Sequence, residues 1–231
     1  TDLKKKNADG SNSLSYCHRQ LLELDPKNLH LPGWDESYSP EQLNGLLGEY
    51  AHISHEQLFE NLVYFLKGIM PACDETGIDM AIHPDDPPWD MFGLPRIITG
   101  ADSYDKMIAA VPDRHNGFTF CTGSLGAGRN NDLPAMAKKY ADRIYFAHIR
   151  QLKYDGERDF AEAGHLTSAG SLDICGIVKA LVEGGFNGYV RPDHGRNIWG
   201  EDGKPGYGLY DRALGAAYLN GLFEAIERYT K

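Results

Sequence analysis

The sequence has few cysteines, and they form no motif. Cys17, Cys73, Cys121 and Cys175 stand far apart, and no two of them make a CxxC pair. A zinc knuckle and a thioredoxin-like redox motif are therefore excluded. Widely spaced single cysteines fit a reducing compartment, so we expect a cytoplasmic protein.

Long apolar runs and a surplus of basic residues are also missing. No stretch approaches the roughly 18 apolar residues that a membrane helix needs, and the opening TDLKKKNADGSNSLSY lacks the apolar core of a signal peptide. The 23 Lys and Arg residues against 33 Asp and Glu residues give a formal net charge of -10. This charge argues against a surface for phosphate backbones. We expect neither a membrane span nor a nucleic-acid partner.

The chain divides into two parts by composition. Residues 1–52 are rich in Lys, Asn, Ser, Gly and Pro without a sustained period, so we expect an irregular insertion with at most short helical turns. Residues 53–231 begin with apolar residues at helical spacing over 55–77, where Gly77 is a candidate helix C-cap.

Strand-like and helix-like segments then alternate four times. The expected strands cover residues 78–84, 117–123, 143–151 and 188–196. The expected helices that follow them cover residues 103–111, 133–142, 171–185 and 210–230. Because parallel neighbours need helical crossovers, this alternation predicts an α/β fold with a parallel sheet.

The repeating units favour a barrel over a dinucleotide fold. No GxGxxG follows the first strand, whereas units of about 30 residues fit a (β/α)8 TIM barrel. Such a barrel usually takes about 250 residues, and four strands would leave two open parallel edges. We expect residues 1–231 to be one domain. Because the sequence shows no strand between Thr1 and the first unit, we expect this domain to be the C-terminal part of a TIM barrel whose N-terminal part is absent from this chain.

Each expected strand ends in a residue that can bind a metal ion. These residues are His83, Cys121, His148 and Asp193. A single His or Cys near a strand is more often packed than ligating, but the ends of parallel barrel strands share one face, where four donors can converge. Two imidazoles, a thiolate and a carboxylate suit zinc, iron or cobalt and do not exclude manganese. With a free coordination position, such a metal acts as a Lewis acid, as in an enzyme.

Two residues near the last strand are candidates for proton transfer. His194 directly follows Asp193 and is either a proton carrier or a structural residue that hydrogen-bonds the turn between strand and loop. Tyr207 stands between Gly206 and Gly208 in a compliant loop, either as a proton donor or acceptor or as an exposed turn aromatic.

Charged residues after the strands are candidates for substrate binding. Arg150 lies two residues after His148, hence on the same strand face, where a guanidinium can bind a carboxylate through two hydrogen bonds or form a structural ion pair. Arg96 and Asp85 stand in the loop after the first strand, where charged residues are often merely solvated.

Six motifs together carry a resemblance to a known family. HPDDPP, GLPRI, CTGSLGAG, HIRQ, RPDHGR and PGYGLYDRALG make the sequence resemble the mannonate dehydratase family over about its whole length. The resemblance implies a xylose-isomerase-like TIM barrel and a homodimer. It also implies a lyase that converts the small sugar acid D-mannonate into 2-dehydro-3-deoxy-D-gluconate and water in hexuronate breakdown.

The resemblance also assigns roles to the candidate residues. The family's metal ligands, which hold Mn2+ or sometimes Fe2+, match His83, Cys121, His148 and Asp193. Its proposed proton-transfer residues match His194 and Tyr207. As a hypothesis, Tyr207, supported by Asp193 or His194, abstracts the proton next to the carboxylate. His194 then protonates the departing hydroxyl, although the two roles can be reversed.

Three alternatives to a dehydratase remain open. A metal-dependent sugar isomerase or epimerase on the same barrel generally uses a carboxylate-rich set, whereas no glutamate ends any of the four strands and Cys121 argues against it. A DNA-repair metallonuclease needs basic loops, which the net charge disfavours. The third alternative is a non-catalytic remnant that binds metal and serves in assembly.

Overall fold

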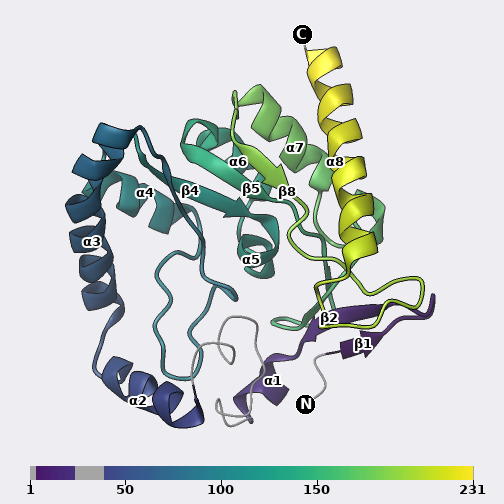
Figure 1. The fold of residues 1–231 in the computed structure, drawn as a ribbon, viewed down its shortest axis with the longest axis horizontal. Helices are drawn as coiled ribbons and strands as arrows, with labels where there is room; N and C mark the ends of the chain where they lie inside the picture. The colour runs from purple at the N-terminus through teal and green to yellow at the C-terminus, as the bar shows by residue number, and fades with distance from the viewer. Residues whose placement is uncertain (1–3, 24–38, 231) are drawn as a thin grey trace.

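The computed structural model describes residues 4–23 and 39–230 (Figure 1). A four-stranded parallel sheet forms the centre of the described chain. Its strands, in spatial order, are β3 (Met80–Ile82), β4 (Asn116–Cys121), β5 (Ile144–His148) and β8 (Tyr189–Arg191). Each expected strand is present, and all neighbours run parallel. The α/β fold class is therefore confirmed.

Helices precede, connect and follow these strands, as the alternation predicted. They are α3 (His55–Thr76), α4 (Ala101–Ala110), α5 (Thr122–Ala127), α6 (Leu133–Lys139), α7 (Ile174–Glu183) and α8 (Leu209–Thr230), with short 3-10 turns at Ala141–Arg143 and Thr167–Ala169. Figure 1 shows α3 and α4 beside one edge of the sheet and α7 and α8 beside the other. Among the described helices, none is long and apolar enough for a membrane crossing.

The core lies between the sheet and these helices. Tyr104 of α4 stacks on Phe118 of β4 with ring centroids 3.7 Å apart and planes inclined by 5°. Both rings are fully buried, as is Leu66 of α3. Burying such side chains stabilises the fold by about 1.5–3 kcal/mol each, so α3 and α4 are fixed on the sheet by apolar packing.

The expectation of an irregular segment over residues 1–52 was wrong where the structure describes it. The segment contains β1 (Lys4–Lys6), β2 (Asn12–Tyr16), α1 (His18–Leu22) and α2 (Pro40–Tyr50). The stretch 24–38 lies outside the described residues. Strands of three and five residues carry no detectable period, which is why the composition argument missed them.

A second sheet joins this segment to the long loop after β5. Strands β6 (Leu152–Tyr154) and β7 (Phe160–Glu162) form a hairpin, and the antiparallel order is β1-β2-β7-β6. Tyr16 of β2 pairs with Phe160 of β7, far along the sequence. A backbone bridge between Asn12 and Asn197 also ties β2 to the loop before α8. The second sheet thus closes over the loops that follow the parallel strands.

Two glycines of the α3 region give a paired stability prediction. Gly77 ends α3 in the left-handed conformation, with φ +68, so Gly77→Ala should lower the free energy of unfolding by about 1 kcal/mol. Gly68 lies inside α3 with open space around its Cα, so Gly68→Ala should raise it by about 0.5–1 kcal/mol. Urea denaturation measures both, and equal effects of the same sign would contradict the capping role of Gly77.

Candidate metal centre and adjoining cavity

Three of the expected metal ligands meet at the carboxyl edge of the parallel sheet. His83 follows β3, Cys121 ends β4 and His148 ends β5. One ligand atom from each lies within 4.8 Å of the others. The register explains this convergence, because Cys121 pairs directly with His148 across the β4–β5 ladder.

The fourth expected ligand, Asp193, lies beside this cluster. Its Oδ2 is 3.8 Å from Cys121 Sγ, and its Oδ1 is 3.4 Å from His148 Nδ1. Asp193 comes two residues after β8, the strand next to β5. Burial by itself would raise the pKa of its carboxyl, but the neighbouring His194 and Arg150 hold that pKa well below its usual range. Asp193 is therefore an ionised carboxylate.

The buried imidazole of His148 fits a metal ligand. Both of its ring nitrogens are buried without a hydrogen-bond partner among the described residues, an arrangement that is costly unless something else satisfies them. Burial lowers the pKa of His148 to about 4, although Asp193 acts in the opposite direction. The ring is therefore neutral at pH 7, which is the form that binds metal ions.

The thiol of Cys121 must lose its proton before it can bind a metal ion. Burial raises its pKa to about 11, and Arg150 offsets this only in part. Because a metal ion binds the thiolate, binding at Cys121 displaces a proton. The set of two imidazoles, one thiol and one carboxylate fits a divalent transition metal.

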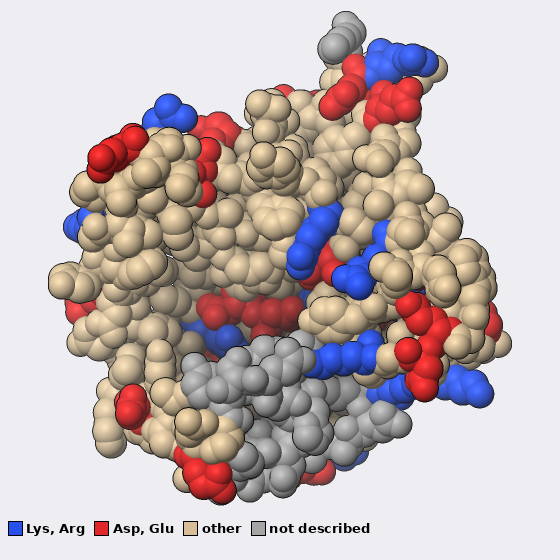
Figure 2. Space-filling model, viewed as in Figure 1, with Lys and Arg blue, Asp and Glu red and all other residues tan. Residues whose placement is uncertain are grey.

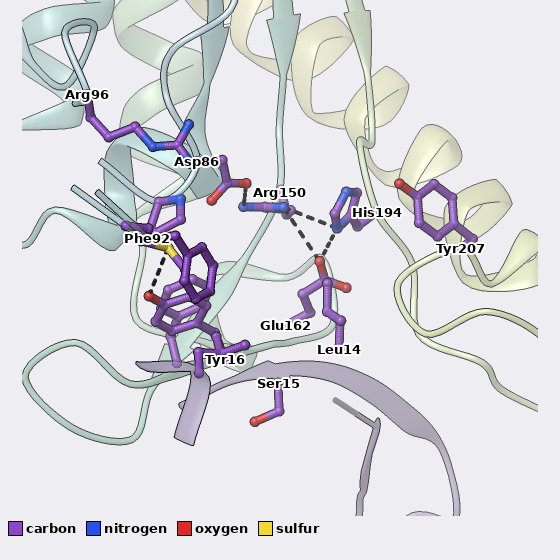
Figure 3. A pocket seen from close by; sticks show the side chains of 14 residues that line it. Leu14, Ser15, Tyr16, Asp86, Phe92, Arg96, Arg150, Glu162, His194 and Tyr207 are labelled. Carbon is purple, nitrogen blue, oxygen red and sulfur yellow. Dashed lines mark hydrogen bonds and ion pairs between the residues drawn. The ribbon is translucent and has the colours of Figure 1, made fainter. Parts of the chain in front are cut away.

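A cavity of about 220 Å³ lies beside Asp193 (Figure 3). Its polar lining includes Asp86, Arg96, Arg150, Glu162, His194 and Tyr207. Two of these residues reach Asp193: Arg150 Nη1 lies 3.8 Å and His194 Nε2 lies 3.6 Å from its Oδ2. In Figure 2, Asp and Glu side chains gather in a hollow in the middle of the face shown, with Lys and Arg nearby.

Arg150 is buried between carboxylates. Its Nη2 donates to Asp86 Oδ2 at 2.8 Å, and its Nη1 lies 3.6 Å from Glu162 Oε1. A Cβ on Gly123 would lie 1.8 Å from Arg150 Nε, so the side chain requires glycine there. The sequence left two roles open for Arg150, a structural ion pair and a position where it can bind substrate. Its side chain forms ion pairs and also lines the cavity.

Asp85 differs from its expected role in substrate binding. Its carboxylate accepts hydrogen bonds from Arg96 Nη1 at 3.2 Å and from the backbone N–H groups of Ile97 and Ile98 at 2.8 Å each. Among the described residues that line the cavity, Arg96 is present and Asp85 is not. The geometry therefore favours a structural role, in which Asp85 holds the loop that presents Arg96.

His194 and Tyr207 face each other at the cavity wall, with ring centroids 5.4 Å apart. The chain folds back because the Gly195 N–H donates to the Gly206 carbonyl at 3.0 Å and the Gly208 N–H donates to the Gly195 carbonyl at 2.9 Å. Burial raises the pKa of Tyr207, and Asp193 adds to the effect. The phenol is therefore protonated at neutral pH.

Two features of the cavity were missed from the sequence. Glu162 is 5% exposed at the end of β7 and contacts both Arg150 and His194. Tyr16 and Phe160 stack with centroids 4.9 Å apart to form an apolar wall. The sequence FAEA over 160–163, with one acid among apolar residues, was a signal for a short buried strand. It lay within a stretch that read as a polar loop.

Comparison with known proteins identifies the family. Residues 1–231 match the family model described as D-mannonate dehydratase (UxuA). The chain belongs to the mannonate dehydratase family. This finding confirms the resemblance inferred from the motifs.

Relatives and a solved structure agree with this assignment. The chain is 49% identical over 221 residues to a mannonate dehydratase of Oceanobacillus iheyensis, covering 95% of the chain and 63% of the relative. It is 48% identical over 244 residues to that of Thermotoga maritima, covering 100% and 68%. The crystal structure of mannonate dehydratase from Streptococcus suis serotype 2 superposes with a TM-score of 0.87 at 43% identity, covering 100% of this chain and 62% of that one. The chain thus spans about two thirds of the length of these mannonate dehydratases.

The metal centre can be tested with cobalt. Because Cys121 lies within 4.8 Å of His83 and His148, Co2+ added to the protein should give a thiolate-to-metal absorption band. Cys121→Ser should abolish the band and weaken binding at least about 10-fold. Cys175→Ser, at an exposed cysteine outside the cluster, should keep both. A band that survives Cys121→Ser would place the metal elsewhere.

Proposed function

We propose that the chain carries the metal-binding part of an enzyme that dehydrates D-mannonate to 2-dehydro-3-deoxy-D-gluconate. The observation that supports this most is the cluster of His83, Cys121 and His148 next to Asp193, at the edge of a cavity lined by His194 and Tyr207. Membership of the mannonate dehydratase family supplies the substrate.

The reaction presents two chemical difficulties. A proton must leave the carbon next to a carboxylate, where the carbon acid is weak, and the hydroxyl on the neighbouring carbon is a poor leaving group. A divalent cation held by His83, Cys121, His148 and Asp193, which we propose to be Mn2+ or Fe2+, supplies electrostatic stabilisation of the negative charge that develops on the substrate oxygens. Proton transfer remains for the side chains of the cavity.

The protonation of Tyr207 bears on how the two proton transfers are divided. Its raised pKa makes the phenol a proton donor at neutral pH, so we propose that it protonates the departing hydroxyl. His194 Nε2 lies on the side of Asp193, 3.6 Å from its Oδ2, and we assign it the abstraction of the carbon-bound proton. This is the reverse of the assignment first drawn from the sequence and uses the same two residues.

Arginines of the cavity wall match the charge of a sugar acid. Arg96 and Arg150 both line the cavity, and a guanidinium binds a carboxylate through charge-assisted hydrogen bonds. We propose that they hold the substrate carboxylate and that Asp85 acts indirectly, through its hydrogen bond to Arg96. The apolar wall of Tyr16 and Phe160 would then face the carbon chain.

We further propose that the parallel sheet forms part of a (β/α)8 barrel in a cytoplasmic homodimer. The four parallel strands with helices between them support the barrel. The chain superposes on the Streptococcus suis structure with a TM-score of 0.87 and covers 62% of it, which leaves length for further strands. The resemblance to the family supports the dimer and the location. An upstream barrel half would cover the open edge of β3.

Turnover of D-mannonate tests the proposed reaction. The chain, and a version extended upstream to the length of its relatives, are assayed with Mn2+ and then with a chelator, while the 2-keto-3-deoxy acid product is measured. Metal-dependent product from the extended version is expected. A rearranged sugar acid as product would instead indicate an isomerase, and no product from either version would contradict the proposal.

Substitution of the two proton-transfer residues tests their roles. In the active version, Tyr207→Phe and His194→Asn should each lower kcat by about 10²- to 10⁴-fold, because each removes a group that exchanges a proton with substrate. Tyr210→Phe is the matched control, since Tyr210 is half exposed at the start of α8, and it should retain full turnover. Either first variant turning over like the parent would remove that residue from the mechanism.

A further inference from the structure

We propose that Glu162 is a positioning residue for His194. Its carboxylate hydrogen-bonds His194 Nδ1 (Figure 3), and the opposite ring nitrogen, Nε2, lies toward Asp193. In this arrangement Glu162 orients the imidazole with its Nδ1–H directed at the carboxylate. The Nε2 lone pair is then directed to the metal side of the cavity.

The surroundings of Glu162 leave it few ways to satisfy its charge. The side chain is 4% exposed, and its Oε2 is buried without a hydrogen-bond partner among the described residues. Its Oε1 has Arg150 Nη1 at 3.6 Å and His194 Nδ1 in direct contact. A buried carboxylate needs such donors, so a proton on His194 Nδ1 contributes directly to holding it.

Arg150 and Glu162 both approach Nδ1 of His194, and the geometry favours Glu162 as its hydrogen-bond partner. Its Nη1 lies 3.1 Å from His194 Nδ1, but a guanidinium only donates and would need a lone pair there. Nδ1 cannot accept from Arg150 and donate to Glu162 at once. Arg150 keeps its hydrogen bond to Asp86 through Nη2 at 2.8 Å, and its Nη1 keeps ion pairs with Glu162 at 3.6 Å and Asp193 at 3.8 Å, whereas Glu162 Oε1 depends on His194 for its hydrogen bond. The proton is therefore assigned to Nδ1.

The backbone around Glu162 keeps this contact in place. Glu162 pairs with Leu152 of β6, and its neighbour Ala161 pairs with Ser15 of β2. On the other side lies Gly206 at φ +86, where a Cβ would stand 3.3 Å from Glu162 Oε2 and 3.4 Å from His194 Nδ1. Glu162, at the end of β7 in the antiparallel sheet, thus contacts His194, which follows β8 of the parallel sheet.

This inference deepens the proposed function and rests on it for its kinetic consequence. A base acting through Nε2 needs its lone pair there, and a carboxylate on the far nitrogen enforces that form, as in triads where an acid orients a histidine. The tautomer itself can be observed whether or not the chain turns over D-mannonate. The two proposals can therefore fail separately.

Nitrogen-15 NMR of the full chain treated with chelator reads the tautomer directly. His194→Asn identifies the His194 signals, because they disappear from its spectrum. In the parent, the proton is expected on Nδ1, and in Glu162→Gln it should move wholly or partly to Nε2. A parent ring protonated on Nε2 would overturn the proposal, and this measurement needs no Glu162 variant to fold.

Kinetics of the metal-loaded, active version provide the second arm. Glu162→Gln should lower kcat about 10- to 100-fold with little change in KM, and Glu162→Asp should recover part of the loss because it keeps a carboxylate. Asp155→Asn, in the same hairpin but at an exposed pair with Lys5, should match the parent. A rise in KM at unchanged kcat for Glu162→Gln would overturn the positioning role. Absence of turnover in the parent would contradict the proposed reaction and leave the NMR result to decide this inference.

Discussion

The parallel register of β3, β4, β5 and β8 is the constraint on which the site depends. Parallel strands present their carboxyl ends at one edge, so a donor at the end of each strand is brought beside the donor of the next. Cys121 and His148 occupy paired positions in the β4–β5 ladder. A shift of one residue would turn one of them to the opposite face, and the cluster would be lost.

Arg150 provides the electrostatic balance that this convergence requires. Several carboxylates gather at the edge of the sheet, and isolated buried charges are unfavourable. The guanidinium lies among Asp86, Glu162 and Asp193, within 2.8 Å, 3.6 Å and 3.8 Å of their oxygens. It can approach so closely because residue 123 is glycine. One buried cation therefore connects the metal side of the cavity with the antiparallel sheet.

The sequence predicted the part of the molecule that local patterns encode. Four strands, the helices between them and the ligand positions His83, Cys121 and His148 follow from alternation and from residues at strand ends. The antiparallel sheet could not be found in this way. Its strands are three to five residues long, and β2 pairs with β7, which lies far away in the chain.

The same limit applies within the site. Glu162 reaches the cavity through the unrecognised strand β7, and the sequence did not show the backbone N–H groups that bind Asp85, whose role in substrate binding stays a prediction. Charge type can be read from a sequence, whereas the partner of a charge depends on tertiary structure. Family membership confirmed the resemblance, but the structure was needed to identify the residues that interact with Glu162 and Asp85.

X-ray absorption spectroscopy of the metal-loaded chain tests the convergence of the strand ends most directly. Loaded with zinc, the protein should show one sulfur neighbour at about 2.3 Å together with nitrogen and oxygen neighbours at about 2.0–2.2 Å. That result would place Cys121 and the imidazoles around one ion, which their separation of at most 4.8 Å allows. A shell of nitrogen and oxygen without sulfur would contradict the account, because the end of β4 would then not reach the metal.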